Sequence, residues 1–384
     1  MADPVPLSKL LAERRVLITV GAGGVGKTTT AAALAVAAAR SGRRVLCLTI
    51  DPAKRLAESL GLGEIGTVGA VVDAAHFARA GVELTGSLTV MMLDTKTTFD
   101  ELVRKYSSTP ARAERLLGNK LYQYVSTSLA GTQEYMAVEK LVAVKDDPRY
   151  DLIVLDTPPT SNALDFLDAP ERLMDALDSA TMKWFVQAFE SSGKLSLNLL
   201  ARSAALALKG IGKLTGGGFL EEMAEFISEL NDLFGGFKQR ATMVQRALRG
   251  PDVSFILVTS PAPMSIREVL YFAERLAESA MSAGALVVNR VHFAPIGGAP
   301  CDVSEAAAAI AARALPLDDD GAGRVAAAHR DAFKLAQLDA SHMRVLSAEH
   351  AGVPVIRIAA RPGDVHDVTQ LAGLGDALMR GGDQ

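Results

Sequence analysis

The chain has 384 residues, of which 49% are hydrophobic and 22% are charged, and its formal net charge is -4. A chain of this length and hydrophobic content can bury a large core. The slightly acidic charge balance argues against nucleic acid as a partner, because it provides no basic field for a phosphate backbone. A membrane-surface role is not indicated either, since no run of Lys and Arg adjoins an amphipathic end of the chain.

The cysteines and the first residues predict the cellular location. Cys47 and Cys301 stand alone in the sequence and do not form a disulfide framework, which is typical of a reducing compartment. The first ten residues contain Asp3 and two prolines and lack the long apolar core of a secretion signal. We therefore expect a cytoplasmic protein.

Short runs rich in β-branched residues predict buried parallel strands, and Ala-rich helical segments lie between several of them. The predicted strands are Val16–Val20, Val45–Ile50, Leu88–Leu93, Leu152–Asp156, Phe255–Ser260, Leu286–Asn289 and Val353–Ile358, and the clearest helices are Thr29–Ser41 and Ile266–Ala283. This alternation predicts an α/β fold with a doubly wound, mostly parallel sheet. Ligands of such sheets bind at the carboxyl ends of the strands.

One part of the chain lacks a strand pattern. Between Pro170 and Leu248, apolar residues such as Met223 and Phe226 recur three or four positions apart, which is typical of one apolar helix face. We predict an α/β domain over residues 12–384, interrupted by a helical subdomain at 170–248 and preceded by a tail at 1–11. The apolar face is either a core or a binding groove, and cores are far more common. Residues 294–323 are predicted to be a loop with one Ala-rich helix.

The segment Gly21–Thr28 matches the pattern G-x-x-x-x-G-K-[ST], between a predicted strand and a predicted helix. Glycines allow a tight turn in which several N–H groups point at one phosphate, and the helix N-terminus adds partial positive charge. Lys27 is expected along the β- and γ-phosphates, and the Thr28 hydroxyl on Mg²⁺. The residues expected to bind the nucleotide here are Gly21, Gly23, Gly24, Val25, Gly26, Lys27, Thr28 and Thr29.

Three further polar residues follow predicted strands. Asp51 is suited either to orient an attacking water or to cap the next helix, and the residue alone does not decide between these. Asp156 is suited to reach Mg²⁺ through water, although the loop Thr157–Thr160 also contains two prolines that simply end a strand. Asn289 has the donor and acceptor pair that an adenine edge requires, but an Asn at this place is commonly a turn residue.

These motifs together resemble the ArsA/Get family of deviant-Walker-A P-loop ATPases, of the bacterial type, over almost the whole chain. Gly23–Thr29 is similar to the family's deviant Walker A motif, Asp51–Ala53 to its switch I, and Asp156–Thr160 to its switch II. Later segments that match are Gly131–Glu134, Phe234–Phe237, Arg267–Glu268 and Val287–Arg290.

The resemblance implies an ATPase that uses ATP and Mg²⁺ and works as a dimer whose nucleotide state controls a hydrophobic client or membrane partner. It implies that Asp51 and Lys27 are catalytic, and that Thr28, Asp51 and Asp156 surround the metal. Asn289 and Pro362 are implied to contact adenine. The helical subdomain corresponds to the region that forms an apolar client groove in the factors that deliver tail-anchored membrane proteins.

The sequence departs from the family at several positions. The signature lysine that reaches the opposite subunit's nucleotide would stand at Ala22, and the cysteines that bind zinc or metalloids in relatives are missing. A second hypothesis is therefore a nucleotide-gated scaffold or assembly subunit with weak hydrolysis, paired in a heterodimer with a lysine-bearing paralogue. A homodimer is the other arrangement considered. A role in arsenite transport is not expected.

Overall fold

The computed structural model describes residues 6–50, 55–62, 66–67, 69–120, 122–123, 126, 132–157, 226, 242–295, 299–313, 319–349 and 353–382. The chain divides into two compact units. The first contains residues 1–92, 148–163 and 251–384, and the second contains residues 93–147 and 164–250. The predicted helical subdomain falls almost entirely outside the described residues.

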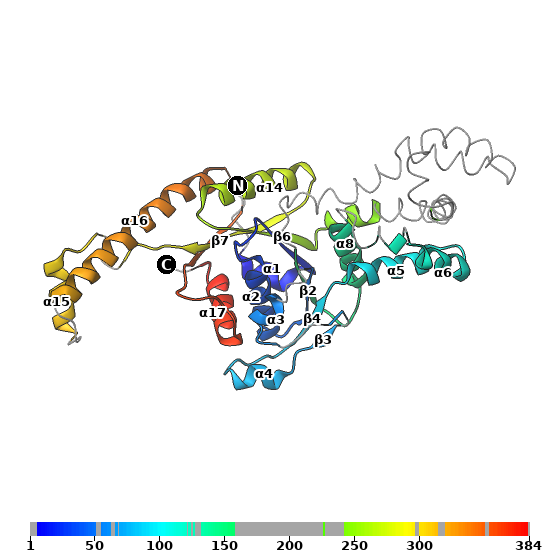
Figure 1. Cartoon of the computed structure of the whole chain (residues 1–384), viewed down its shortest axis with the longest axis horizontal. Helices are drawn as coiled ribbons and strands as arrows, with labels where there is room; N and C mark the ends of the chain where they lie inside the picture. The colour runs from blue at the N-terminus through cyan, green and yellow to red at the C-terminus, as the bar shows by residue number, and fades with distance from the viewer. Residues whose placement is uncertain are drawn as a thin grey trace, which may run out of the picture. The chain divides into compact units, whose positions relative to one another are not determined.

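The first unit is built on an eight-stranded sheet with the strand order β3-β4-β2-β5-β1-β6-β7-β8 (Figure 1). The strands are β1 (Val16–Val20), β2 (Arg44–Thr49), β3 (Ala70–Val71), β4 (Ser87–Met92), β5 (Leu152–Asp156), β6 (Val253–Thr259), β7 (Ala283–Val291) and β8 (Val355–Ala359). All neighbouring pairs are parallel except β3 with β4. The predicted α/β class with a mostly parallel sheet is confirmed.

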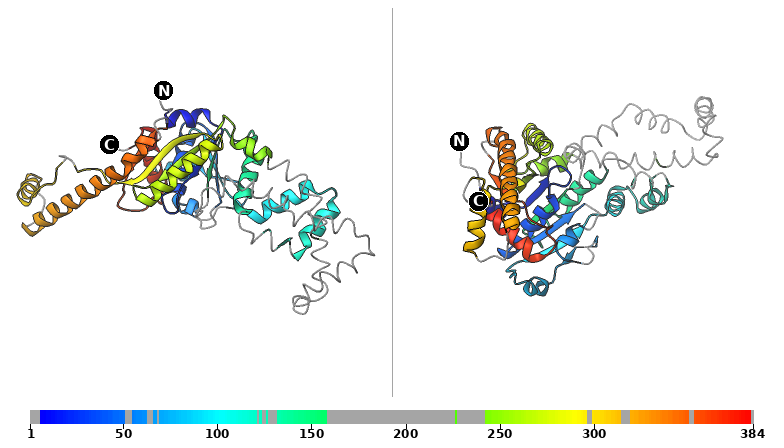
Figure 2. Two further views of the ribbon diagram at one scale, coloured as in Figure 1. Left: turned by 90° about the horizontal axis from the view of Figure 1, so that it is seen from above. Right: turned by 60° about the vertical axis from the view of Figure 1, so that its left-hand side comes forward.

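Helices lie on both faces of the sheet, which explains why the strands β1, β5 and β6 are buried along their whole length. The helices of this unit are α1 (Leu7–Glu13), α2 (Lys27–Arg40), α3 (Arg55–Ser59), α4 (Ala74–Arg79), α14 (Pro263–Glu278), α15 (Val303–Ala312), α16 (Asp319–Glu349) and α17 (Val368–Met379). Helix α15 and the first part of α16 extend away from the sheet (Figure 1). Figure 2 shows α16 as one long helix with α15 beside its first part. None of the described helices combines the length and the apolarity that a membrane crossing requires.

One core lies between the sheet and the helices α1, α2 and α17. Side chains of a strand alternate between its two faces, and Leu17, Val154 and Ile256 all point into this core. Helix α2 contributes a run of buried alanines, and such small side chains let α17 pack closely against it (Figure 1). Leu7, Leu10 and Leu11 of α1 are buried in the same core.

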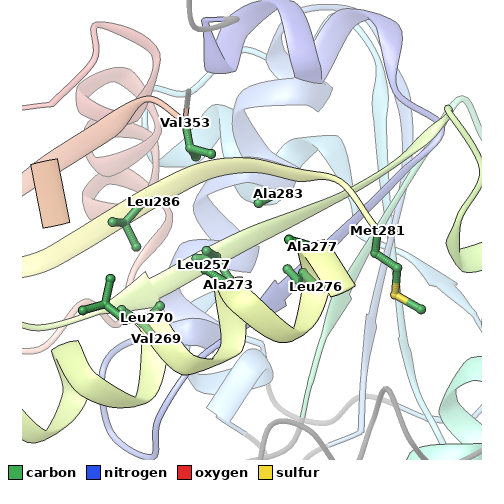
Figure 3. Close-up of a pocket in the computed structure, with 10 residues that line it drawn as sticks. All are labelled: Leu257, Val269, Leu270, Ala273, Leu276, Ala277, Met281, Ala283, Leu286 and Val353. Carbon is green, nitrogen blue, oxygen red and sulfur yellow. The ribbon is translucent and has the colours of Figure 1, made fainter. Parts of the chain in front are cut away.

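On the opposite face, α14 packs over β6 and β7 and leaves a small apolar cavity of about 180 Å³ (Figure 3). Its lining includes Leu257 and Leu286 of the strands and Val269 and Leu276 of α14. None of the residues that line it belongs to the Gly21–Thr28 loop.

The described part of the second unit is helical. It contains α5 (Thr95–Tyr106), α6 (Pro110–Gly118) and α8 (Thr132–Lys145), and α5 packs against both of the others. Asp94 and Thr109 cap the N-termini of α5 and α6 through side-chain acceptors, which satisfies amide groups that lack a helical partner. Tyr122 donates to Asp100 over 2.5 Å and its ring contacts Phe99, which anchors the segment after α6 on α5.

An exposed ion pair joins the starts of two neighbouring strands and predicts a pH dependence. The Arg44 guanidinium donates to Asp151 over 2.6 and 3.0 Å and, chiefly through this hydrogen bond, lowers the pKa of Asp151 from 3.8 to about 2. The stability that the pair contributes is therefore present above pH 3.8 and is lost as the pH falls towards about 2. We expect Asp151→Asn to lower the urea midpoint slightly at neutral pH, with the difference shrinking over that acidic range. A difference that stayed constant down to pH of about 2 would contradict this account.

Candidate active site

The loop Gly21–Thr28 lies between β1 and α2, in the strand–loop–helix context that the sequence predicts. Three of its glycines have positive φ angles: 152° at Gly21, 76° at Gly24 and 99° at Gly26. Gly26 is the N-cap residue of α2, and the helix begins at Lys27. The loop therefore lies at the positive end of the helix dipole, where an anion is stabilised.

Two of the glycines also have neighbours so close that no side chain would fit. A Cβ atom on Gly21 would overlap the carbonyl oxygen of Val258 in β6, and one on Gly26 would overlap the side-chain amide of Asn289 in β7. Both conflicts add to the strain that an L-residue has at these φ angles. The loop is thus packed tightly from the side of β6 and β7.

Lys27 is the positive charge of the loop. Its side chain is only 5% exposed, and its Nζ donates to the carbonyl oxygen of Ala22 over 2.8 Å. This contact folds the side chain back along the loop rather than into solvent. A buried ammonium at the N-terminus of a helix favours a multiply charged anion.

Asp156 joins the loop to the neighbouring strands. Its Oδ2 accepts from the Thr28 hydroxyl over 2.8 Å and from the Thr49 hydroxyl over 3.0 Å, and its side chain is fully buried. Because β1, β2 and β5 are parallel neighbours, their carboxyl ends bring these three residues to one edge of the sheet. The sequence placed Thr28 and Asp156 in one site, and the structure brings them into contact.

The buried thiol of Cys47 lies close to this carboxylate. Burial raises the pKa of Cys47, and the negative charge of Asp156 raises it further. The thiol is therefore protonated at neutral pH and supplies no thiolate to the site.

The other predicted site residues lie at the same edge or outside the described residues. Asn289 is near the end of β7, and its amide Nδ2 donates to the carbonyl oxygen of Val25 over 2.9 Å. Pro362 is exposed in the loop that follows the neighbouring strand β8. Asp51 lies outside the described residues, and so does most of the loop after Thr157.

Sequence reasoning missed two threonines that organise this edge. Thr49 is the last residue of β2 and binds Asp156, and Thr157 donates to the carbonyl oxygen of Thr19 over 2.8 Å. Both are polar side chains at the end of a buried strand; Thr157 directly follows Asp156, and Thr49 stands two residues before Asp51. That position was the available signal, because a buried hydroxyl needs a hydrogen-bond partner.

A parallel α/β sheet whose first strand leads through a glycine loop into a helix, with a carboxylate on the adjacent strand, defines a P-loop nucleotide-binding protein. A family model described as anion-transporting ATPase, ArsA ATPase, matches residues 14–316. The chain therefore belongs to the ArsA ATPase family.

Curated relatives from fungi agree with this assignment. The get3 ATPase of Aspergillus terreus is 26% identical over 284 residues, which are 73% of this chain and 74% of the relative. The GET3 ATPases of Chaetomium globosum and Podospora anserina are 27% and 28% identical and cover 77% of this chain and 78% and 79% of their own lengths. The chain is an ATPase of the ArsA/Get3 kind and binds ATP. Because these relatives are fungal, they do not bear on the expectation of a bacterial type.

Proposed function

We propose that this ATPase hydrolyses ATP with Mg²⁺ and works as a dimer whose nucleotide state controls the binding of a hydrophobic client. The observation that carries the metal part is the contact between the Thr28 hydroxyl and the Asp156 carboxylate. Both are hard oxygen donors next to the loop, and Mg²⁺ prefers such ligands together with phosphate oxygens. When bound, Mg²⁺ would neutralise charge on the phosphates during transfer. Asp156 would hold it through water, and Thr28 directly.

The remaining site residues have roles in this proposal that follow from their types and positions. Lys27 and the loop amides Gly21, Gly23, Gly24, Val25, Gly26, Thr28 and Thr29 would hold the phosphates. Asp51, which follows β2 by two residues, would orient the attacking water and stand near the metal. Asn289 and Pro362 would flank the base, which is supported by the place of Asn289 on β7 and of Pro362 in the loop after the neighbouring strand β8.

The dimer and the client rest on family membership and on the apolar pattern at 170–248. Of the residues named from that pattern, Phe226 is described, and it lies in a helix with its side chain partly exposed. We also propose a cytoplasmic location, which is supported by two free thiols at Cys47 and Cys301. The partner subunit is either a second copy or a paralogue with lysine at the place of Ala22.

The association state tests this proposal directly. We expect the purified chain to shift from a looser to a tighter dimer on binding a non-hydrolysable ATP analogue with Mg²⁺, as measured by light scattering and by crosslinking. Capture of a hydrophobic transmembrane peptide should differ between the ATP-analogue and ADP states by about tenfold, which corresponds to a coupling free energy of about 1.4 kcal/mol.

Two other outcomes are informative. Association that occurs only after a lysine-bearing paralogue is added would favour the heterodimer. Peptide capture that is identical in all nucleotide states would contradict control of the client by nucleotide.

A further inference from the structure

Asn289 makes a contact that base recognition does not require. Its Nδ2 donates to the main-chain carbonyl of Val25 over 2.9 Å, and its Oδ1 accepts from the backbone N–H of Arg290 over 3.0 Å. One donor of the amide is therefore engaged with the phosphate loop, and the acceptor is engaged with its own strand. The side chain is also so close to Gly26 that a Cβ atom there would overlap it.

The end of β7, which carries Asn289, has an irregular backbone. Strand β7 continues past the end of β6, and its pairing with β8 shifts register between Val288 and Val291. Arg290 within this irregularity has a φ of 61°, a left-handed conformation that is rare for a residue with a side chain. Such bulges turn a side chain out of its regular direction, and this one lies beside the residue that reaches the loop.

Hydrogen bonds with α16 and with the residue after β8 fix the backbone that follows Asn289. The backbone N–H of His292 and its ring Nδ1 both lie within hydrogen-bond distance of the Asp339 carboxylate, at 2.8 and 2.9 Å. The Val291 carbonyl also accepts from Ala360 over 2.8 Å. The backbone immediately after Asn289 is therefore held in place by these hydrogen bonds, and this fixes the position from which Asn289 reaches the phosphate loop.

The peptide unit between Val25 and Gly26 links this contact to phosphate binding. In a planar trans peptide the carbonyl and the N–H point in opposite directions. A donor that holds the Val25 carbonyl towards β7 therefore turns the Gly26 N–H away from β7. Without this bond, the unit could rotate and place a carbonyl dipole where an amide must meet a phosphate.

We propose that Asn289 is a positioning residue of the phosphate loop, which orients the Val25–Gly26 peptide and thereby sets the affinity of the loop for the phosphates themselves. This inference rests on the proposed nucleotide site and deepens it. It differs from adenine recognition in its consequence: the effect of Asn289 should persist when the ligand has no base.

The test compares ligands with and without a base in the full-length protein. Binding of Mg·ATP, Mg·GTP and Mg·tripolyphosphate is measured by calorimetry for the wild type, Asn289→Ala and Asn289→Asp. Alanine removes the donor, while aspartate keeps the size and places an acceptor against the Val25 carbonyl. We expect both variants to weaken ATP and tripolyphosphate by similar factors, about tenfold for alanine and more for aspartate. The preference for ATP over GTP should not change.

Two further measurements separate positioning from other roles. A misplaced loop should lower kcat as well as raise KM, whereas loss of a base contact acts on substrate and transition state alike and raises KM alone. Gln337→Glu makes the same change from amide to carboxylate on an exposed position of α16, and should leave binding unchanged. Melting temperatures identify variants that fail to fold.

Normal tripolyphosphate affinity in Asn289→Ala, together with weaker ATP binding and a relaxed base preference, would overturn the positioning role in favour of adenine recognition. A wild-type protein that binds neither Mg·ATP nor tripolyphosphate would instead contradict the proposed nucleotide site, which distinguishes the two failures.

Discussion

Lys27→Ala is expected to abolish ATP turnover while leaving the fold intact. The side chain carries the charge of the loop, and it is buried there with its Nζ on the Ala22 carbonyl. Removing an ammonium that would contact the transferred phosphate eliminates a charge-assisted hydrogen bond that strengthens as charge develops in the transition state. We expect kcat/KM to fall by about a thousandfold or more, with weaker ATP binding as well. Steady-state phosphate release and calorimetric binding of Mg·ATP measure the two effects.

The matched control for this prediction is Lys9→Ala. Lys9 lies on α1 of the same unit, is exposed and pairs across one helical turn with Glu13 over 3.8 Å. Its loss removes the same side chain without touching the loop, so turnover should remain at the wild-type level. If Lys27→Ala hydrolysed ATP at the wild-type rate, the assignment of the phosphate loop would be wrong.

The central strands were predictable because burial on both faces leaves continuous apolar runs. Val16–Val20 and Leu152–Asp156 were predicted with the bounds that the structure has. The edge strand β3 was not, since Ala70 and Val71 are both exposed and two residues carry no pattern. Loss of signal at the edge of the sheet is the expected consequence of solvent contact.

The helices show which local signals were misread. Helix α14 begins at Pro263, a residue favoured in the first helical turn, and ends at Glu278, whereas the predicted helix ran on to Ala283. Nothing in the sequence between these two ends is a strong breaker. Helix α16 begins at Asp319, inside the segment 294–323 that was predicted to be a loop with one helix. Acidic residues stabilise a helix N-terminus, and this effect outweighs the nearby glycines.

Some contacts of the candidate site could also be predicted from the sequence, and others could not. Contact between Thr28 and Asp156 could be predicted, because Asp156 ends one strand, Thr28 follows the loop after another, and a parallel sheet brings such strand ends together. The contact between Asn289 and Val25 could not, because it depends on how far β7 extends beyond β6 and on the register shift after Val288. These are properties of pairing between distant segments, and no local pattern encodes them.

Asp156→Asn should separate the charge of this residue from its hydrogen bonds. An asparagine oxygen can still accept from the Thr28 and Thr49 hydroxyls, so the fold and the melting temperature should be nearly unchanged. The negative charge that would hold Mg²⁺ is lost, and metal ions contribute several kcal/mol to such reactions. We expect turnover at moderate Mg²⁺ to fall by about a hundredfold or more, with partial recovery at high Mg²⁺. A Mg²⁺ titration of the ATPase rate measures both.

Two comparison variants make the result specific to the charge. Thr49→Val removes one hydrogen bond to Asp156 and keeps the carboxylate, so it should lower turnover only severalfold and leave the Mg²⁺ dependence in place. Asp156→Ala leaves two hydroxyls without their acceptor in a buried place, so it should lower the melting temperature where Asp156→Asn does not. Wild-type Mg²⁺ dependence in Asp156→Asn would mean that Asp156 acts only as a hydrogen-bond acceptor for the Thr28 and Thr49 hydroxyls, and the metal would have to be held by other residues.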